Sequence, residues 1–208
     1  PDKSGMAHHL TAQNGLALSK YENPTLDYPS IAVMDFDGSN DYADRANETV
    51  FNAGNNLDIQ LAVRLDTLPA STTAYGIIVN GATTANWRLF AYNNGTKSYF
   101  VFQVYNSGGT VFEVNTSADP SIAANKWYVI RLQLVLSSIL KMTVNGTTYS
   151  VTAPTTLRAA SGNFQLGRLT TSSYLDGKIY AVALAVNDNS DDLAHYALWN
   201  SMRDYLDV

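Results

Sequence analysis

Short β-rich runs separated by turn residues recur along most of this sequence, at a spacing of roughly ten residues. Between residues 57 and 66, Leu, Ile, Leu, Val and Leu alternate with mostly polar residues, which is the period-two pattern of a half-buried strand. Residues 127–136 are apolar on nearly both faces, as in a central strand between packed layers. Asn145-Gly146 separates two further runs and favours the type I′ turn of a hairpin. Together these features predict an all-β sandwich or barrel.

The remaining expected strands cover residues 31–36, 75–79, 87–92, 98–105, 111–114, 139–144, 147–152, 163–166 and 178–186. One helix is expected over residues 190–206, because Ser190 is a suitable N-cap and two aspartates follow it in the first turn. Apolar residues with helical spacing would dock this helix on the sandwich. No linker or repeat divides the sequence, so residues 1–208 are expected to form a single domain.

The composition excludes several classes of protein. With 46% hydrophobic and 15% charged residues, the 208-residue chain is too apolar to be disordered. It has no run of 18 apolar residues, which argues against membrane insertion. The net charge of −5 and the lack of any Lys/Arg cluster argue against nucleic-acid binding. Without cysteine, the chain has no disulfides and no thiolate metal ligands.

Several ordered motifs carry a family resemblance. They are Asp2–Leu10, Met34–Tyr42, the alternating run Leu57–Leu65, Asn125–Tyr128, Val144–Gly146 and Tyr174–Ile179. In this order they resemble a laminin-G-like domain of the concanavalin A-like lectin/glucanase superfamily, of the kind found in phage structural proteins. The resemblance implies an all-β, two-sheet antiparallel jelly-roll sandwich, carrying the one C-terminal helix. It also implies that the core between the sheets contains Phe36, Tyr42, Trp127 and Leu166.

Glucanases of this superfamily carry a Glu-x-Asp-x-x-Glu pattern, which places a nucleophile and an acid on one face of a strand. The sequence lacks this pattern, and its three glutamates are scattered. Asp35 and Asp37 alternate on one expected strand and are the only pair worth testing as catalytic groups. The alternative is that they solvate the strand end and cap the turn at Gly38. We therefore expect no enzymatic activity and assign no catalytic residue.

A cluster of oxygen-bearing side chains suggests a metal site. Carboxylate and amide oxygens in a turn suit Ca²⁺, and the candidate calcium ligands are Asp35, Asp37, Asn40 and Asp41. An Asx-rich turn without metal is the favoured alternative, because Asp and Asn are ordinary turn residues. No cofactor other than calcium is suggested.

Sugar recognition requires aromatic faces together with amides and carboxylates. Five residues on neighbouring expected strands and turns meet this need, namely Trp87, Tyr92, Asn94, Tyr99 and Tyr105. The alternative is that half of these aromatic side chains belong to the core. Thirteen tyrosines would also suit a polar protein–protein contact surface.

The function expected first is a non-catalytic module of a virion surface, decoration or tail-associated protein, which mediates assembly or attachment. The alternatives are a lectin-like module for cell-surface glycans and, with less support, a glycan-degrading enzyme. The expected partners are other virion or surface proteins and glycans, and homo-oligomerisation is left open. No signal peptide is visible at residues 1–5, so the expected location is a virion or an extracellular surface after synthesis in the cytoplasm.

Overall fold

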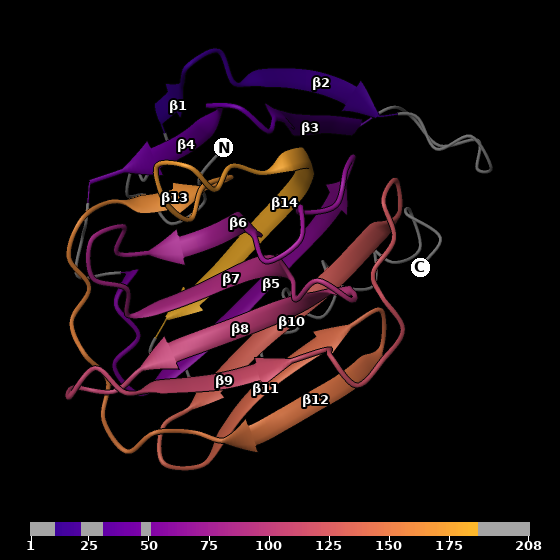
Figure 1. The fold of residues 1–208 in the computed structure, drawn as a ribbon. Coiled ribbons are helices and arrows are strands. Elements are labelled where there is room, and N and C mark those ends of the chain that lie inside the picture. Colours follow the sequence, from indigo (N-terminus) through magenta and orange to yellow (C-terminus); the bar gives the residue numbers. More distant parts are fainter. Residues whose placement is uncertain (1–10, 22–30, 47–50, 187–208) are drawn as a thin grey trace.

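The computed structural model describes residues 11–21, 31–46 and 51–186, which form two antiparallel seven-stranded sheets stacked face to face (Figure 1). The first sheet has the order β1 (Thr11–Gln13), β4 (Tyr42–Arg45), β13 (Phe164–Leu166), β6 (Ala74–Asn80), β7 (Trp87–Asn93), β8 (Ser98–Tyr105) and β9 (Val111–Asn115). The second has the order β12 (Thr147–Thr152), β11 (Ile139–Val144), β10 (Trp127–Val135), β5 (Asn56–Leu65), β14 (Asp176–Val186), β3 (Ile31–Asp37) and β2 (Ala17–Tyr21).

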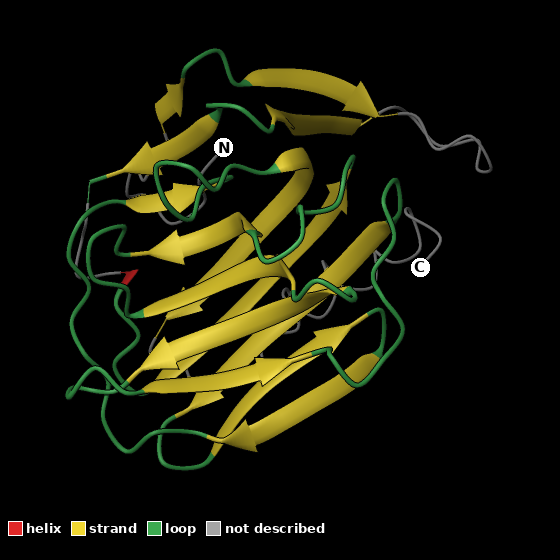
Figure 2. Cartoon of the chain, viewed as in Figure 1, coloured by secondary structure: helices red, strands yellow, loops and turns green. Residues whose placement is uncertain are grey.

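The predicted all-β sandwich is confirmed. The part of the chain that the structure describes consists of strands and loops, with one short piece of 3₁₀ conformation at Phe51 and no α-helix (Figure 2). Most predicted strands end within a residue or two of the observed ones. The sequence reading missed β1, β2 and β4, which are only three to five residues long. The expected helix over residues 190–206 lies outside the described residues.

The hairpin that joins β11 to β12 has the predicted geometry. Asn145 and Gly146 have φ values of 46° and 88°, and positive φ at both central positions defines a type I′ turn. Val144 and Thr147 close the hairpin as a pair. The Asn145 side chain also accepts a hydrogen bond from the backbone N–H of Val129 on β10, at 2.8 Å. This bond ties the turn to the neighbouring strand.

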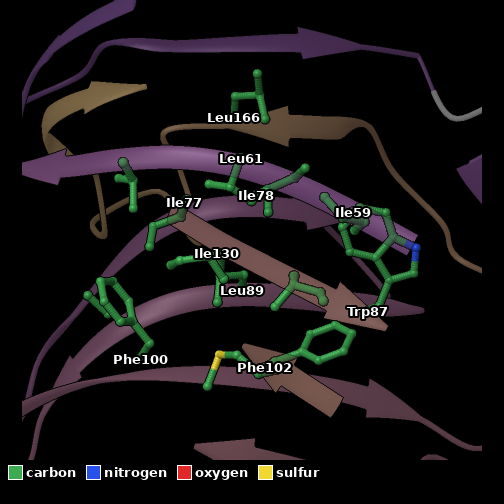
Figure 3. Close-up of a cluster of buried hydrophobic side chains, with 14 of the residues drawn as sticks. Ile59, Leu61, Ile77, Ile78, Trp87, Leu89, Phe100, Phe102, Ile130 and Leu166 are labelled. Atoms are coloured by element: carbon green, nitrogen blue, oxygen red, sulfur yellow. The ribbon is translucent and has the colours of Figure 1, made fainter. Parts of the chain in front are cut away.

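The core fills the space between the two sheets (Figure 3). Along β5, the odd-numbered residues point inward, and Ile59 and Leu61 are fully buried. They face side chains of the first sheet such as Ile78, Leu89 and Phe102. Each such side chain contributes about 1.5–3 kcal/mol relative to an exposed position, so the stacked layers are held mainly by apolar burial.

Of the four expected core residues, two belong to the main cluster between the sheets, one is buried outside that cluster and one is partly exposed. Phe36 and Leu166 are confirmed as members of the core cluster. Trp127 is buried, but its side chain lies on the outer face of the second sheet. Its cross-strand partner Arg64 is next to the inward-pointing Leu65, so Arg64 and Trp127 both point away from the first sheet. Tyr42 is partly exposed, and its ring lies tilted against that of Tyr174, with 6.3 Å between ring centroids. The burial expected for Trp127 is therefore confirmed, although it lies outside the main cluster, and the expectation was wrong for Tyr42. Aromatic character does not reveal which face of a strand is the inner one.

Candidate glycan-binding surface

The outer face of the first sheet carries aromatic side chains because β7 and β8 alternate. Their inward residues include Trp87 and Phe100, which are fully buried in the core. The residues between them point outward, and the antiparallel register places Tyr92 opposite Tyr99. The same register places Phe90 opposite Val101. Two cross-strand pairs therefore lie side by side on the face that looks away from the core.

These side chains line a shallow depression of about 210 Å³, which we call the aromatic hollow. Its lining residues are Phe90, Tyr92, Tyr99, Val101, Gln103 and Glu113. Phe90 and Val101 are buried and form its apolar floor, whereas Tyr92 and Tyr99 are partly exposed. The two tyrosine rings meet edge to face, with centroids 5.7 Å apart. The hollow is smaller than a pocket for a drug-sized molecule, which is about 300–1,000 Å³, so it fits one or two small rings.

A chain of hydrogen bonds fixes the polar side of the hollow. The Gln103 amide donates to Oε2 of Glu113 at 2.7 Å, and Asn115 donates to Oε1 at the same distance. Gln103 Oε1 in turn accepts from Nε of Arg88 at 2.8 Å and from the Tyr105 hydroxyl at 3.1 Å. The Glu113 carboxylate is therefore held in one orientation. It keeps acceptor capacity for a ligand, because two carboxylate oxygens offer about four lone-pair sites.

The hydroxyl group of Tyr99 stays protonated near neutral pH. Partial burial raises the pKa of Tyr99, and the negative charge of Glu113 and the neighbouring Tyr92 raise it further. A protonated phenol both donates and accepts hydrogen bonds. The hollow thus offers aromatic faces, a hydroxyl group, an amide and a carboxylate, which is the mixture that hydroxyl-rich ligands require.

The structure brings together only two of the five predicted sugar-binding residues, Tyr92 and Tyr99. Trp87 is fully buried, and its indole N–H donates to the carbonyl of Phe51 at 3.1 Å. The prediction was wrong for Trp87, because a side chain between the sheets cannot stack on a ligand at the surface.

Tyr105 and Asn94 lie outside the hollow. Tyr105 is 8% exposed, and the guanidinium of Arg158 lies 4.3 Å from the centre of its ring. Its ring face is therefore occupied. Asn94 is in the turn between β7 and β8, where its Oδ1 accepts from the backbone N–H groups of Thr96 and Lys97, at 3.0 Å each. Asn94 caps this turn.

Sequence reasoning missed Phe90, Val101, Gln103 and Glu113 as members of the site. The period-two alternation that groups Tyr99 with Tyr105 also groups Val101 and Gln103 with them, so these two could have been found. Glu113 comes from β9, and only the pairing of Gln103 with Glu113 reveals its position.

The candidate calcium ligands form a tight turn at the end of β3. Asp37 Oδ1 accepts from the backbone N–H groups of Ser39, at 2.8 Å, and Asn40, at 3.2 Å. These bonds lower the pKa of Asp37, chiefly through Ser39. Gly38 has a φ of +75°, as this turn requires. This geometry is that of the Asx-rich turn.

The other candidate ligands have different surroundings. Asp35 forms an ion pair with Lys178 of β14. Asp41 is buried, and burial raises its pKa, with a further increase from the charge of Asp37. Within the described residues, no three Asp, Glu, His or Cys side chains are grouped so that they could hold a metal ion. The residues as arranged do not form a calcium cage, and the calcium site stays a prediction that chelation can test.

The aromatic hollow lacks the arrangement that glycoside hydrolysis needs. That reaction uses two carboxyl groups about 5–10 Å apart. Glu113 is the only carboxylate among the described residues that line the hollow. Asp35 and Asp37 belong to the second sheet, in the ion pair and the turn already described.

The described residues also include no helix of the length and apolar character needed to cross a membrane.

Comparison with known proteins identifies similar folds. The family model of the concanavalin A-like lectin/glucanases superfamily matches residues 37–186, which is more than half of the chain. No curated protein sequence matches the chain.

Solved structures align over most of this chain. The binding domain of botulinum neurotoxin DC in complex with SialylT has a TM-score of 0.67 and 16% identity, covering 93% of this chain and 46% of that one. A botulinum neurotoxin type C structure, whose cell entry depends on interaction with two ganglioside molecules, has a TM-score of 0.64 and 14% identity, with the same coverage. Domains LG4-5 of the mouse laminin α1 chain have a TM-score of 0.52 and 18% identity, covering 76% of this chain and 43% of theirs. The chain thus spans about half the length of these structures, and the likeness shows the fold.

Proposed function

The chain belongs to the concanavalin A-like lectin/glucanases superfamily, and we propose that it is a non-catalytic binding domain that holds a saccharide in the aromatic hollow. One observation carries this proposal, namely the meeting of the Tyr92 and Tyr99 rings with the fixed carboxylate of Glu113 on a solvent-facing sheet. Aromatic rings stack on the apolar faces of sugars, and the carboxylate accepts hydrogen bonds from their hydroxyl groups. The likeness to toxin structures named for SialylT and gangliosides supports a glycan partner.

Neutral saccharides are the proposed ligand class. Glu113 carries a negative charge at the rim, and the chain as a whole has a net charge of −5. A carboxylate on the ligand would be repelled at this position, because two like charges disfavour each other at short range. The ligand preference would then differ from that of a site for sialylated glycans.

Binding to a glycan array, followed by calorimetry on the best neutral oligosaccharide, tests the proposal. We expect Tyr99→Ala and Tyr92→Ala each to weaken binding by about tenfold, which corresponds to roughly 1.4 kcal/mol of lost stacking. Glu113→Gln should weaken binding of the neutral glycan and reduce discrimination against sialylated ones. Tyr174→Ala is the matched control, since Tyr174 is also partly exposed but lies outside the hollow. A blank array, or equal effects of Tyr99→Ala and Tyr174→Ala, would refute the proposal.

The virion role expected from the sequence stays a prediction. The similar structures are named as toxin binding domains and laminin domains, so they bear on binding and not on virion assembly. Cosedimentation of the protein with capsids would support attachment to a virion. Absence from the capsid fraction, together with glycan binding in solution, would leave the lectin-like alternative.

A further inference from the structure

The strand β12 forms one edge of the second sheet, and no other strand of the described residues covers that edge (Figure 1). In the described part of the chain it pairs only with β11, over six residues without a register shift. All its residues except Tyr149 are exposed, and Val151 is 40% exposed. Natural edge strands usually carry charges, prolines or bulges that prevent pairing with another chain. The sequence of β12, Thr-Thr-Tyr-Ser-Val-Thr, contains none of these.

The other edge strands differ from β12. β2 contains Lys20, β9 contains Glu113, and β1 has only three residues. A charged side chain or a very short strand each reduces the tendency of an edge to pair. β12 is therefore the longest edge and, apart from the short β1, the only one without charge among the described strands.

The hairpin determines which backbone groups of β12 are available. A type I′ turn closes with a hydrogen bond between the residues that flank it, here Val144 and Thr147. Because hydrogen-bonded pairs alternate along an antiparallel ladder, every second residue from Thr147 bonds to β11. The N–H of Ala153 follows the same alternation and donates to Ser138. The N–H and C=O groups of Thr148, Ser150 and Thr152 consequently point away from the sheet.

We propose that β12 pairs with β12 of a second copy of this chain, antiparallel about a two-fold axis at Ser150. This register is the one that engages all three outward residues, with Ser150 opposite Ser150 and Thr148 opposite Thr152. Each hydrogen-bonded pair exchanges two backbone bonds. The two sheets would join into one continuous sheet across the dimer.

The side chains are complementary in the same register. Tyr149 lies opposite Val151 of the second copy, and aromatic–β-branched pairs stabilise antiparallel strands. Hydroxyl-bearing residues face each other at the remaining positions, and no charge is brought near a like charge within β12. Such a two-fold contact occupies the β12 edge of each copy, so neither β12 can pair with a third copy. The assembly is therefore a closed dimer and not a filament. A contact of one strand falls at the low end of specific interfaces, about 1,200 Å² or less, so the dimer is expected to be weak.

Sedimentation velocity over a wide concentration series tests this arrangement on the full chain. We expect the mass of the wild-type protein to rise from that of the monomer towards that of the dimer. Ser150→Lys places two like charges opposite each other and should raise the dimer dissociation constant by about tenfold or more. The matched control is Ser172→Lys, which adds the same charge at an exposed position of the loop between β13 and β14 and should behave as wild type.

Mixing two variants tests the register itself. Ser150→Lys and Ser150→Glu should each be monomeric, whereas an equimolar mixture should form a heterodimer, because opposite charges then face each other at the axis. Circular dichroism of each variant establishes that it is folded. A wild-type protein that remains monomeric throughout the series would overturn the proposal. So would a mixture of the two variants that stays monomeric.

Discussion

Replacing Trp87 by phenylalanine separates a role in the core from a role in ligand binding. The substitution keeps an aromatic ring between the sheets but removes the indole N–H, which donates to the carbonyl of Phe51. That carbonyl also accepts from the Asn80 side chain at 2.8 Å, so it keeps one partner. The loss is therefore that of one ordinary hydrogen bond, about 1 kcal/mol, without the larger penalty of an unpaired buried group.

The smaller ring adds a packing cost. Trp87 is fully buried and lies edge-on to Phe164, with 6.0 Å between ring centroids. Complete truncation of a buried tryptophan costs about 3–5 kcal/mol, and the partial truncation to phenylalanine about 1–2 kcal/mol. Together with the hydrogen bond, the free energy of unfolding should fall by about 2–3 kcal/mol.

Urea denaturation measures this change as a lower midpoint with an unchanged slope, because the slope reports the surface exposed on unfolding. Tyr99→Phe is the control variant for stability. Because Tyr99 is partly exposed, loss of its hydroxyl group should change the free energy of unfolding by less than about 0.5 kcal/mol. Glycan binding by the folded Trp87→Phe protein should equal that of wild type. Unchanged stability combined with lost binding would refute the assignment of Trp87 to the core.

Three further outcomes follow from local contacts. Burial and the hydrogen bond to Asp119 raise the pKa of Tyr149 to about 12 from 10.0. The protonated Tyr149 therefore stabilises the folded state fully below pH 10, and this contribution is lost as the pH rises towards 12. Tyr149→Phe should flatten the alkaline decline in melting temperature. Gly76→Ala should destabilise the fold strongly, because a Cβ atom there would lie 2.1 Å from the backbone nitrogen of Leu169; a melting temperature equal to wild type would contradict this. Chelation should leave the melting temperature unchanged, since Asp37 already caps its turn; a decrease that calcium reverses would instead support the predicted calcium site.

The fold was predictable because the alternating pattern of residues 57–66 and the Asn145-Gly146 turn are local signals. They report strand faces and hairpins directly. The short strands β1 and β4 carry too few residues to show a period, and their pairing with each other depends on contacts distant in the sequence. Local pattern thus predicts the layers, whereas the edge of the first sheet requires the three-dimensional structure.

The candidate site was predictable only in part. Tyr92 and Tyr99 were found because both belong to a hairpin whose register follows from its turn. Trp87 was misplaced because alternation defines two faces but does not state which one is buried. Glu113 was passed over because its place beside Gln103 depends on a third strand. Candidate site residues can be predicted from the sequence when they lie on the two strands of one hairpin. They are missed when they come from a third strand, as Glu113 does.

All six side chains that line the aromatic hollow lie between residues 90 and 113. In this stretch, the outward residues touch the solvent side, while the residues between them build the core. Under the proposed function, residues that would contact a ligand therefore alternate with core residues along one short segment. If the proposal holds, the outward residues of this segment could be exchanged without altering the core residues between them, and the segment would be a suitable unit for grafting a new specificity onto the same fold.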